Sequence, residues 1–140
     1  MKTEIPGKIF MKGIGNCSNT DAGLLALRLG LAAVFLAHGI QKAMGFEMTV
    51  EMFAGLGLPE AVAAVVTAVE ILAGLAMLLG VYVKYAGYAI AILMVGAIAL
   101  IKADMGFFGG WEYDLVLLLN GLAVAWLGAG SCRLDVKEVG

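Results

Sequence analysis

The sequence predicts an all-α membrane protein, a left-handed bundle of four transmembrane helices with both termini in the cytoplasm. Three observations lead to this prediction. Hydrophobic residues make up 62% of the 140 residues and charged residues only 14%, against about 45–50% and about 25% in soluble domains. Four segments are apolar over enough residues to cross a bilayer. Basic residues are also divided unequally between the two sides of these segments.

The four predicted spans follow from length and composition. A hydrocarbon core about 30 Å thick needs roughly 20 mostly apolar residues per helix. The segments that meet this requirement are residues 22–43, 60–82, 85–102 and 111–129. They form one transmembrane domain over residues 22–130, between an N-terminal tail (1–21) and a C-terminal tail (131–140). The N-terminal tail lacks the apolar stretch of a signal peptide.

Local residues predict where these helices begin and end. Residues 19–21 (Asn, Thr and Asp) offer side-chain oxygens to cap the first helix. Pro59 and Glu60 suit the start of the second, because proline lacks an N–H that would be unpaired there and glutamate faces the positive helix end. Only residues 84–85 separate the second and third spans, which are therefore expected to be antiparallel neighbours. Gly128 and Gly130 end the fourth span.

The orientation follows from the basic residues. Four spans place both tails on one side, where six lie outside the spans: Lys2, Lys8, Lys12, Lys84, Arg133 and Lys137. The other side has only Lys42 and Lys102. The excess favours cytoplasmic tails. Cys17 and Cys132 would then lie on the reducing side, where no stable disulfide is expected.

The segment 46–59 lies between the first two spans on the outer side. Met48, Met52 and Phe53 fall on one face at helical spacing. This pattern predicts a short amphipathic helix on the membrane surface over the mouth of the bundle. A loop packed on the helix ends is the alternative.

Small residues recur at four-residue spacing within the spans, where they would let helix backbones approach closely. The pairs are Ala26 and Gly30, Gly87 and Ala91, and Gly121 and Ala125.

Three polar residues lie inside the spans: Arg28, Glu70 and Asn120. A charge at the bilayer centre costs at least about 2.5–3.5 kcal/mol, so such residues face inward and find partners. Helix rise places Glu70 and Asn120 near the midplane and Arg28 about 7 Å toward the cytoplasm, a distance that an extended arginine can reach. The sequence therefore predicts an Arg28–Glu70 ion pair with Asn120 beside it. The pair either fixes helix register or forms a site for a polar head group or a proton.

A second polar layer is predicted nearer the outer face, formed by His38, Gln41, Lys42, Trp111, Glu112 and Asp114. His38 and Lys42 are four residues apart and share a helix face. We expect them to meet Glu112 in one cluster under the segment 46–59 and to bind the polar head of a ligand. The alternative is a closed Lys42–Glu112 salt bridge, with His38 bonded to a backbone carbonyl.

Several classes of function are not supported by the sequence. There is no basic face for nucleic acid, and no CxxC, nucleophile elbow, phosphate loop or dinucleotide-binding glycine pattern. A single histidine does not make a metal or haem site. We therefore expect no catalytic motif, metal or cofactor of the chain's own. Redox chemistry would need a borrowed cofactor, a lipid-soluble substrate such as a quinone, or a partner subunit.

Five stretches in order resemble the DoxX family of small four-helix membrane proteins: RLGLAAVFLAHGIQK, GLGLPE, VEILAGLAMLLG, GGWEYDL and LGAGSCRLD. The positions that match the family pattern are Arg28, His38, Gly39, Lys42, Pro59, Glu70, Gly80, Glu112 and Asp135. The last stretch has Gly-Ala-Gly at 128–130 where the family usually has Gly-Pro-Gly.

The resemblance implies a membrane subunit or partner of a quinone-linked oxidoreductase system in a prokaryotic cytoplasmic (inner) membrane. A quinone would be the ligand, and oxidoreductase subunits or further copies of this chain would be the partners within the lipid bilayer. Whether the chain has activity alone is left open. The alternatives are a non-catalytic assembly or chaperone subunit and, less favoured, a small transporter, because no broken helix or inverted repeat is visible.

Overall fold

A computed structural model describes residues 10–11 and 18–135, and this part of the chain is almost entirely helical. Its α-helices are α1 (Asn19–Met44), α2 (Phe46–Gly55), α3 (Glu60–Leu79), α4 (Val83–Ala97) and α5 (Glu112–Leu127). Between α4 and α5 lie a π-helical turn, Ile98–Lys102, a 3₁₀ turn, Ala103–Met105, and the segment Phe107–Trp111, in which Phe108, Gly109 and Gly110 have non-helical backbone angles. The strands β1 (Phe10–Met11) and β2 (Leu134–Asp135) form an antiparallel pair. The all-α fold is confirmed.

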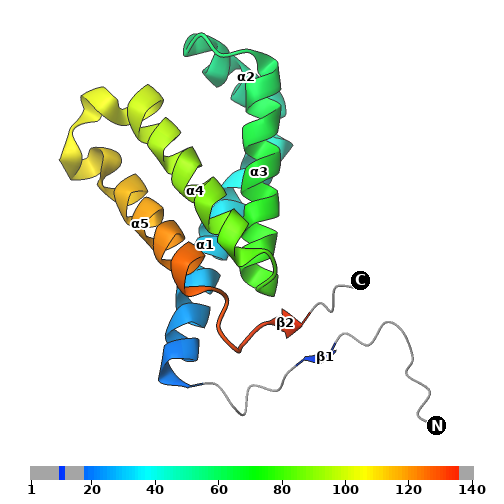
Figure 1. Cartoon of the computed structure of the whole chain (residues 1–140). Coiled ribbons are helices and arrows are strands. Elements are labelled where there is room, and N and C mark those ends of the chain that lie inside the picture. The colour runs from blue at the N-terminus through cyan, green and yellow to red at the C-terminus, as the bar shows by residue number, and fades with distance from the viewer. Residues whose placement is uncertain (1–9, 12–17, 136–140) are drawn as a thin grey trace.

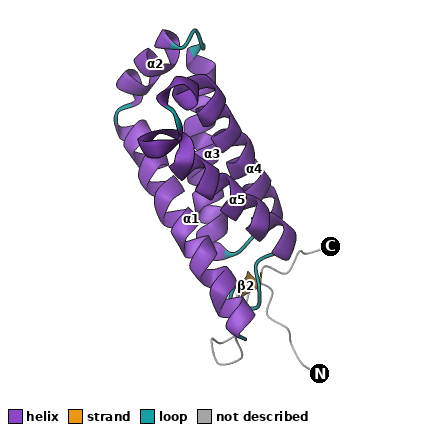
Figure 2. Cartoon of the chain, turned by 90° about the vertical axis from the view of Figure 1, so that its left-hand side faces the viewer, coloured by secondary structure: helices purple, strands orange, loops and turns teal. Residues whose placement is uncertain are grey.

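The long helices form two pairs that meet along one seam. α1 packs chiefly on α3, and α4 on α5. Figure 1 shows α3 and α4 diverging from the turn that joins them, with α2 at the far end of α3. In the view turned by 90°, α1, α3, α4 and α5 run along a common direction (Figure 2). The α3–α4 seam therefore provides the larger part of the contact between the two pairs.

Three helical segments are long and apolar enough to cross a membrane: Asn19–Met44, Glu60–Leu79 and Val83–Met105. α5 has 16 residues, about 24 Å by helix rise, which is shorter than the hydrocarbon core. The fourth span thus stays a prediction, although α5 returns the chain to the end where it began. The pairing of β1 with β2 places both ends of the described chain together, opposite α2 (Figure 1). Which side of the membrane they occupy also stays a prediction.

The boundary of α1 differs from the expectation by a few residues. Ser18, and not residues 19–21, is the N-cap: its Oγ accepts from the Asp21 N–H at 3.2 Å, and the Asp21 carboxylate accepts from the Ser18 N–H at 3.0 Å. This reciprocal arrangement satisfies two backbone donors that a helix start leaves unpaired. The other Asp21 oxygen accepts from the Ser131 N–H at 2.8 Å. Asp21 therefore also ties the start of α1 to the segment after α5.

The turn between α3 and α4 lies earlier than predicted. Gly80 has φ 75° and Tyr82 has φ 50°, so the chain reverses there, while Lys84 and Tyr85 belong to α4. Left-handed backbone is favourable for glycine and ends a helix efficiently. The two helices are antiparallel neighbours, as expected. Gly128, with φ 84°, ends α5 as predicted.

Two of the three small-residue pairs lie at a close helix contact. A Cβ built on Gly87 would be 2.5 Å from the Gly121 carbonyl oxygen and 2.8 Å from the Ala125 Cβ. The backbones of α4 and α5 therefore approach each other closely, which small residues at a helix contact in lipid allow. Gly30, in contrast, meets nothing within 4 Å, so the pair with Ala26 does not mark a contact.

Cys132 is disulfide-bonded in the structure. The expectation that no disulfide forms at this end of the molecule is therefore wrong for Cys132. The β1–β2 pairing brings Phe10–Met11 beside Leu134–Asp135, close in sequence to Cys132. Cys17, the chain's other cysteine, lies outside the described residues.

Candidate ligand site along the α3–α4 seam

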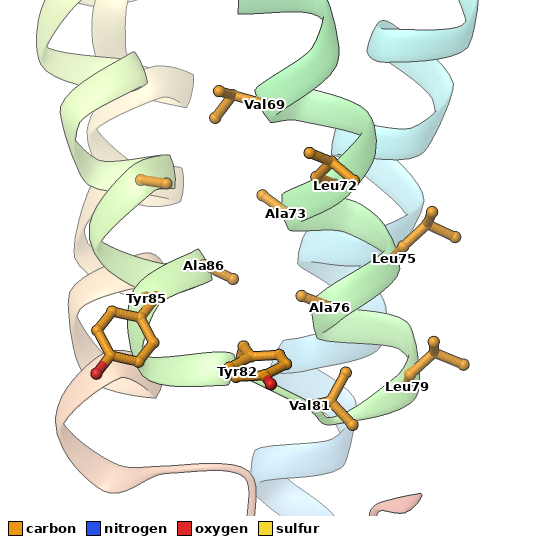
Figure 3. A pocket seen from close by; sticks show the side chains of 11 residues that line it. Val69, Leu72, Ala73, Leu75, Ala76, Leu79, Val81, Tyr82, Tyr85 and Ala86 are labelled. Carbon is orange, nitrogen blue, oxygen red and sulfur yellow. The ribbon is translucent and has the colours of Figure 1, made fainter. Parts of the chain in front are cut away.

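Two hollows lie along the seam between α3 and α4. The first, which we call the seam groove, is open, lies near the α3–α4 turn and has a volume of about 400 Å³. Figure 3 shows Tyr82 and Tyr85 at its turn end. Its lining is apolar apart from the two tyrosine hydroxyls: Val69, Leu72, Ala73, Leu75, Ala76, Leu79, Val81, Tyr82, Tyr85, Ala86 and Ala89.

The second hollow, which we call the head cavity, is smaller and lies toward α2. Its volume is about 160 Å³. Met52 and Phe53 of α2 contribute to its wall, and Leu100 and Ile101 come from the π-helical turn after α4. Among the described residues that line it, Lys42 and Glu70 are the charged ones. The head cavity is thus an apolar pocket with one polar end.

Lys42 and Glu70 form an ion pair at this polar end. The Lys42 Nζ lies 2.5 Å from the Glu70 Oε1. Glu70 is only 4% exposed, and its second oxygen, Oε2, is buried without a hydrogen-bond partner among the described residues. An unsatisfied buried carboxylate oxygen is costly, and among the described residues Glu70 Oε2 and Asp114 Oδ2 are in this state.

The close approach of α1 and α3 positions the pair. A Cβ built on Gly39 would lie 2.7 Å from the Ile71 Cγ1 and 3.2 Å from the Glu70 Cβ. Only a glycine allows this contact without a shift of the neighbours. The register that results places the last turn of α1, and with it Lys42, beside the middle of α3.

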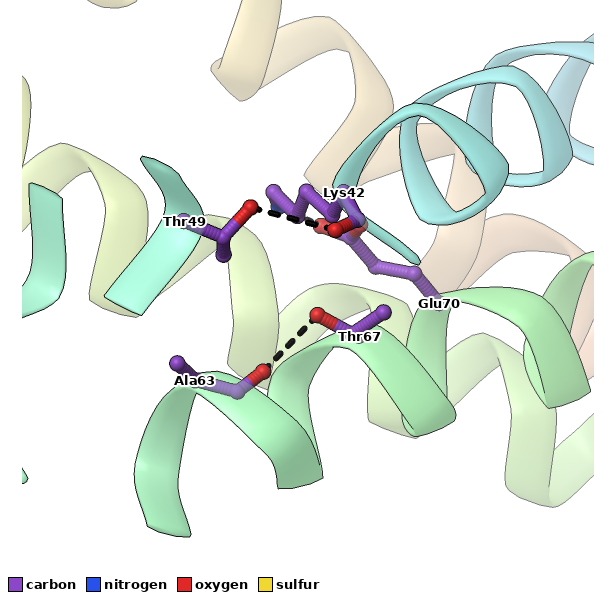
Figure 4. A network of polar contacts seen from close by, with 5 residues as sticks. All are labelled: Lys42, Thr49, Ala63, Thr67 and Glu70. Atoms are coloured by element: carbon purple, nitrogen blue, oxygen red, sulfur yellow. Dashed lines mark hydrogen bonds and ion pairs between the residues drawn. The ribbon is translucent and has the colours of Figure 1, made fainter. Parts of the chain in front are cut away.

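Two threonines near the pair are already bonded to backbone (Figure 4). The Thr49 hydroxyl lies 3.2 Å from the Lys42 carbonyl oxygen and 3.1 Å from that of Gly45, which fastens α2 to the end of α1. The Thr67 hydroxyl donates to the Ala63 carbonyl at 2.8 Å. Their donor hydrogens are therefore not directed to Glu70.

The predicted Arg28–Glu70 ion pair does not form. Arg28, 1% exposed, donates through Nε to the Met77 carbonyl at 3.0 Å and through Nη1 to the carbonyls of Ala129 and Cys132 at 2.8 Å each. The α1–α3 register explains the difference. It places Arg28 level with the α3–α4 turn, where helix ends present free carbonyls.

The predicted Lys42–Glu112 contact does not form either. The Glu112 Oε1 accepts from the Gly109 N–H of its own loop at 2.9 Å. Asp114, 5% exposed, instead has its Oδ2 2.6 Å from the Lys102 Nζ, an ion contact without hydrogen-bond geometry. The π-helical turn and the irregular segment between α4 and α5 bring Lys102 to Asp114. The outer layer therefore contains two separate Lys–carboxylate pairs.

The remaining candidates do not join the head cavity. His38 and Gln41 are exposed on α1, and Trp111 packs edge-to-face on Phe107 with ring centroids 4.9 Å apart. Asn120 is partly buried on α5, outside the cavity lining. The sequence predicts Met48, Met52 and Phe53 on one face of a helix over the mouth of the bundle. Met52 and Phe53 line the cavity, whereas Met48 is 75% exposed. The structure brings together only Lys42 and Glu70 from the predicted set, and any ligand contact by the others stays a prediction.

These features define a class of protein: a small α-helical integral membrane protein with a buried Lys–Glu pair beside a hollow in a helix seam. The chain belongs to the DoxX family, whose profile matches residues 23–103. That range covers α1 to α4, and with them both hollows, but not α5.

Two bacterial proteins show how the similarity extends. The chain is 33% identical over 115 residues to the protein named "Putative oxidoreductase CatD" of Bacillus subtilis strain 168, covering 82% of this chain and 86% of the relative. It is 34% identical over 128 residues to "Uncharacterized membrane protein Rv3486" of Mycobacterium tuberculosis H37Rv, covering 80% and 78%. No solved structure matches the chain.

Proposed function

We propose that this chain is a membrane subunit or partner of a quinone-linked oxidoreductase and binds the quinone head in the head cavity. The observation that carries the proposal is the buried Glu70 Oε2, which has no hydrogen-bond partner among the described residues and lies beside the ammonium group of Lys42. Intramembrane ionisable groups turned toward a cavity commonly serve ligand or proton binding.

The size and lining of the head cavity suit a single ring. An apolar cavity of about 150 Å³ can hold benzene, and this one has about 160 Å³. Its walls are formed by side chains such as Phe53, Val66 and Leu93, with charge only where Lys42 and Glu70 lie. A ring with a polar oxygen directed at Lys42 and Glu70 would find donors and an acceptor there and apolar contacts elsewhere.

Each charged residue has a distinct role in the proposal. A bound quinone takes up two electrons and two protons to become a quinol, and the electrons would come from the partner subunit. Lys42 uses one N–H toward Glu70 and has two more that can donate to a ring oxygen. Glu70 can accept from a hydroxyl through Oε2 or, when protonated, deliver a proton there. The Coulombic field of Lys42 would also favour added negative charge on the ring.

The relative with an oxidoreductase name supports the redox part of the proposal. That name says nothing of a quinone or of partner subunits, so these rest on the head cavity and on the family resemblance. The chain shows no sequence motif for a cofactor of its own, which is why we assign it the role of partner and not that of a complete enzyme.

The test is binding of a head-group benzoquinone to the full chain in detergent, measured by isothermal titration calorimetry. Glu70→Gln should weaken binding about tenfold, because the charge that holds the Lys42 ammonium donor beside the ring is lost and the lysine can extend toward the membrane surface. Glu47→Gln, on the exposed face of α2, is the matched control and should bind like the wild type. Equal affinity of Glu70→Gln and the wild type would refute the site.

Native mass spectrometry of protein purified from its own membrane tests the partner. We expect a quinone and at least one further subunit to co-purify. A subunit without any quinone would instead favour the assembly role.

A further inference from the structure

We propose that the seam groove holds the hydrocarbon chain of the ligand whose ring lies in the head cavity, so that the ligand enters sideways from the lipid. This inference rests on the proposed function and deepens it. It identifies the ligand class as an amphiphile with one polar ring and a long alkyl or isoprenoid chain.

The first support is the continuity of the two hollows. On α3, Val66 and Glu70 line the head cavity while the intervening Val69 lines the seam groove. On α4, Ala89 lines the groove, and Ile92, less than one turn further, lines the cavity. Neighbouring residues of the same two helices therefore form both walls, and a chain attached to the ring can pass from one hollow to the other.

The second support is the chemistry of the lining. The described residues of the groove include no charged side chain, so its complement is a segment without polar groups. Leu72 is 65% exposed, and Tyr82 and Tyr85 are 67% and 70% exposed, so the groove faces the surroundings and not the core. In a membrane those surroundings are lipid tails, with the tyrosines at head-group level.

The third support comes from the position of α2 beside the head cavity and from the length of the seam groove along α3. Met52 and Phe53 line the head cavity at its α2 end, so we expect a bulky chain attached to the ring to leave along the seam. Nine residues separate Glu70 from Leu79, about 14 Å along α3, close to half of a hydrocarbon core. A chain that starts at the ring can thus stay within the membrane for the whole length of the groove.

The acyl chain of an ordinary phospholipid is the competing occupant. Its head group would remain at the membrane surface and would make no use of Glu70. The two occupants can be distinguished by experiment, because only the proposed ligand occupies the seam groove and the head cavity at the same time.

The experiment compares two benzoquinones with the same head group, one with a methyl and one with a decyl substituent. Ala89→Phe fills the groove, and Ala68→Phe, exposed on α3 and lining neither hollow, is the matched control. By calorimetry, Ala89→Phe should weaken binding of the decyl compound about tenfold or more, since several buried methylene groups lose their contacts. Binding of the methyl compound should change less than about twofold. Ala68→Phe should alter neither affinity.

Each outcome decides between the hypotheses. Unchanged affinity of Ala89→Phe for the decyl compound overturns the inference. This holds even if phospholipid no longer co-purifies with the variant, because the groove is then a lipid site only. Equal losses for both compounds overturn it as well. If Ala89→Phe does not fold, Ala76→Leu in the same groove takes its place with the same expected split. Failure of Glu70→Gln to weaken the methyl compound refutes the proposed function instead, so the two failures are distinguishable.

Discussion

Two basic side chains of α1 are held in different ways at opposite ends of the molecule. Arg28, near the paired chain ends, is buried and donates to three backbone carbonyls. Lys42, near α2, is bonded to one oxygen of Glu70, whose other oxygen has no partner among the described residues. The Arg28 guanidinium therefore joins α1, α3 and the segment after α5. The Lys42–Glu70 pair retains unused hydrogen-bonding capacity beside the head cavity.

The difference teaches how to separate a structural charge from a candidate functional one. Location within a predicted span does not distinguish the two residues, because both lie within α1. The hydrogen bonding of the buried groups around them does distinguish the two residues. A buried polar group whose neighbours are all hydrogen-bonded stabilises the fold. A buried polar group that is left partly unbonded costs stability unless it has another use. The predictions below test this separation, from the largest expected effect to the smallest.

Arg28→Leu should cause the largest loss of stability. It leaves the carbonyls of Met77, Ala129 and Cys132 without their charged donor, and hydrogen bonds to charged groups contribute about 1.5–3 kcal/mol each. We expect the free energy of unfolding in detergent to fall by at least about 3 kcal/mol. Lys84→Leu, an exposed basic residue of α4, is the control and should change it by less than about 0.5 kcal/mol. Equal effects of the two variants would show that Arg28 is not a structural clamp.

Lys42→Met and Glu70→Gln should both weaken binding of the head-group quinone, each about tenfold. Glu70→Gln should lower the free energy of unfolding by only about 1 kcal/mol, because the partly exposed Lys42 can extend toward the membrane surface. Lys42→Met should lower it by about 3 kcal/mol, because it leaves the buried Glu70 carboxylate without its cation. The double variant should lose less than the sum of the single losses, since the residues are in contact. Strictly additive losses of affinity would show that they act independently.

Asp114→Asn should affect stability only. It removes the carboxylate charge beside Lys102, and Lys102 is partly exposed, so we expect a loss of about 1 kcal/mol or less in a thermal or chemical unfolding measurement. Neither residue lines the head cavity. A change of quinone affinity in this variant would show that the second ion pair belongs to the ligand site.

His38→Leu should have the smallest effect. The side chain is exposed on α1 and does not line the head cavity, so quinone affinity should stay within about twofold and stability within about 0.5 kcal/mol. The comparison uses the same titration and unfolding measurements as above. A tenfold weaker affinity would restore His38 to the site.

Much of the architecture could be predicted from the sequence, because it depends on apolar length and local helix signals. The sequence predicts in this way the helical runs of α1, α3 and α4, the helix α2, and the location of both ends of the described chain at one end of the molecule. Lys42 and Glu70 could be selected as polar residues in an apolar environment. Their pairing with each other could not be predicted by aligning the centres of the spans, because α1 has 26 residues and α3 only 20.

The outer layer was harder to predict for a different reason. Helical periodicity fails between α4 and α5, where a π-helical turn and the non-helical residues Phe108, Gly109 and Gly110 redirect the chain. The partners of Glu112 and Asp114 depend on that irregular path. A useful signal was present in α1 and α3: Gly39 and Gly74 lie at the tight helix contact, and small residues there could have fixed the register.

The tight contact at Gly39 offers a way to change the chemistry of the site without replacing a charged residue. A methyl group at position 39 would meet Ile71 and the stem of Glu70 at distances that force the helices apart. The gap between the Lys42 ammonium and the Glu70 carboxylate would then widen, and the balance between ion pair and ligand contact would change. In descendants of this sequence, a larger residue at position 39 should therefore be accompanied by a smaller one at position 71, and homologues could be sorted by that compensation alone.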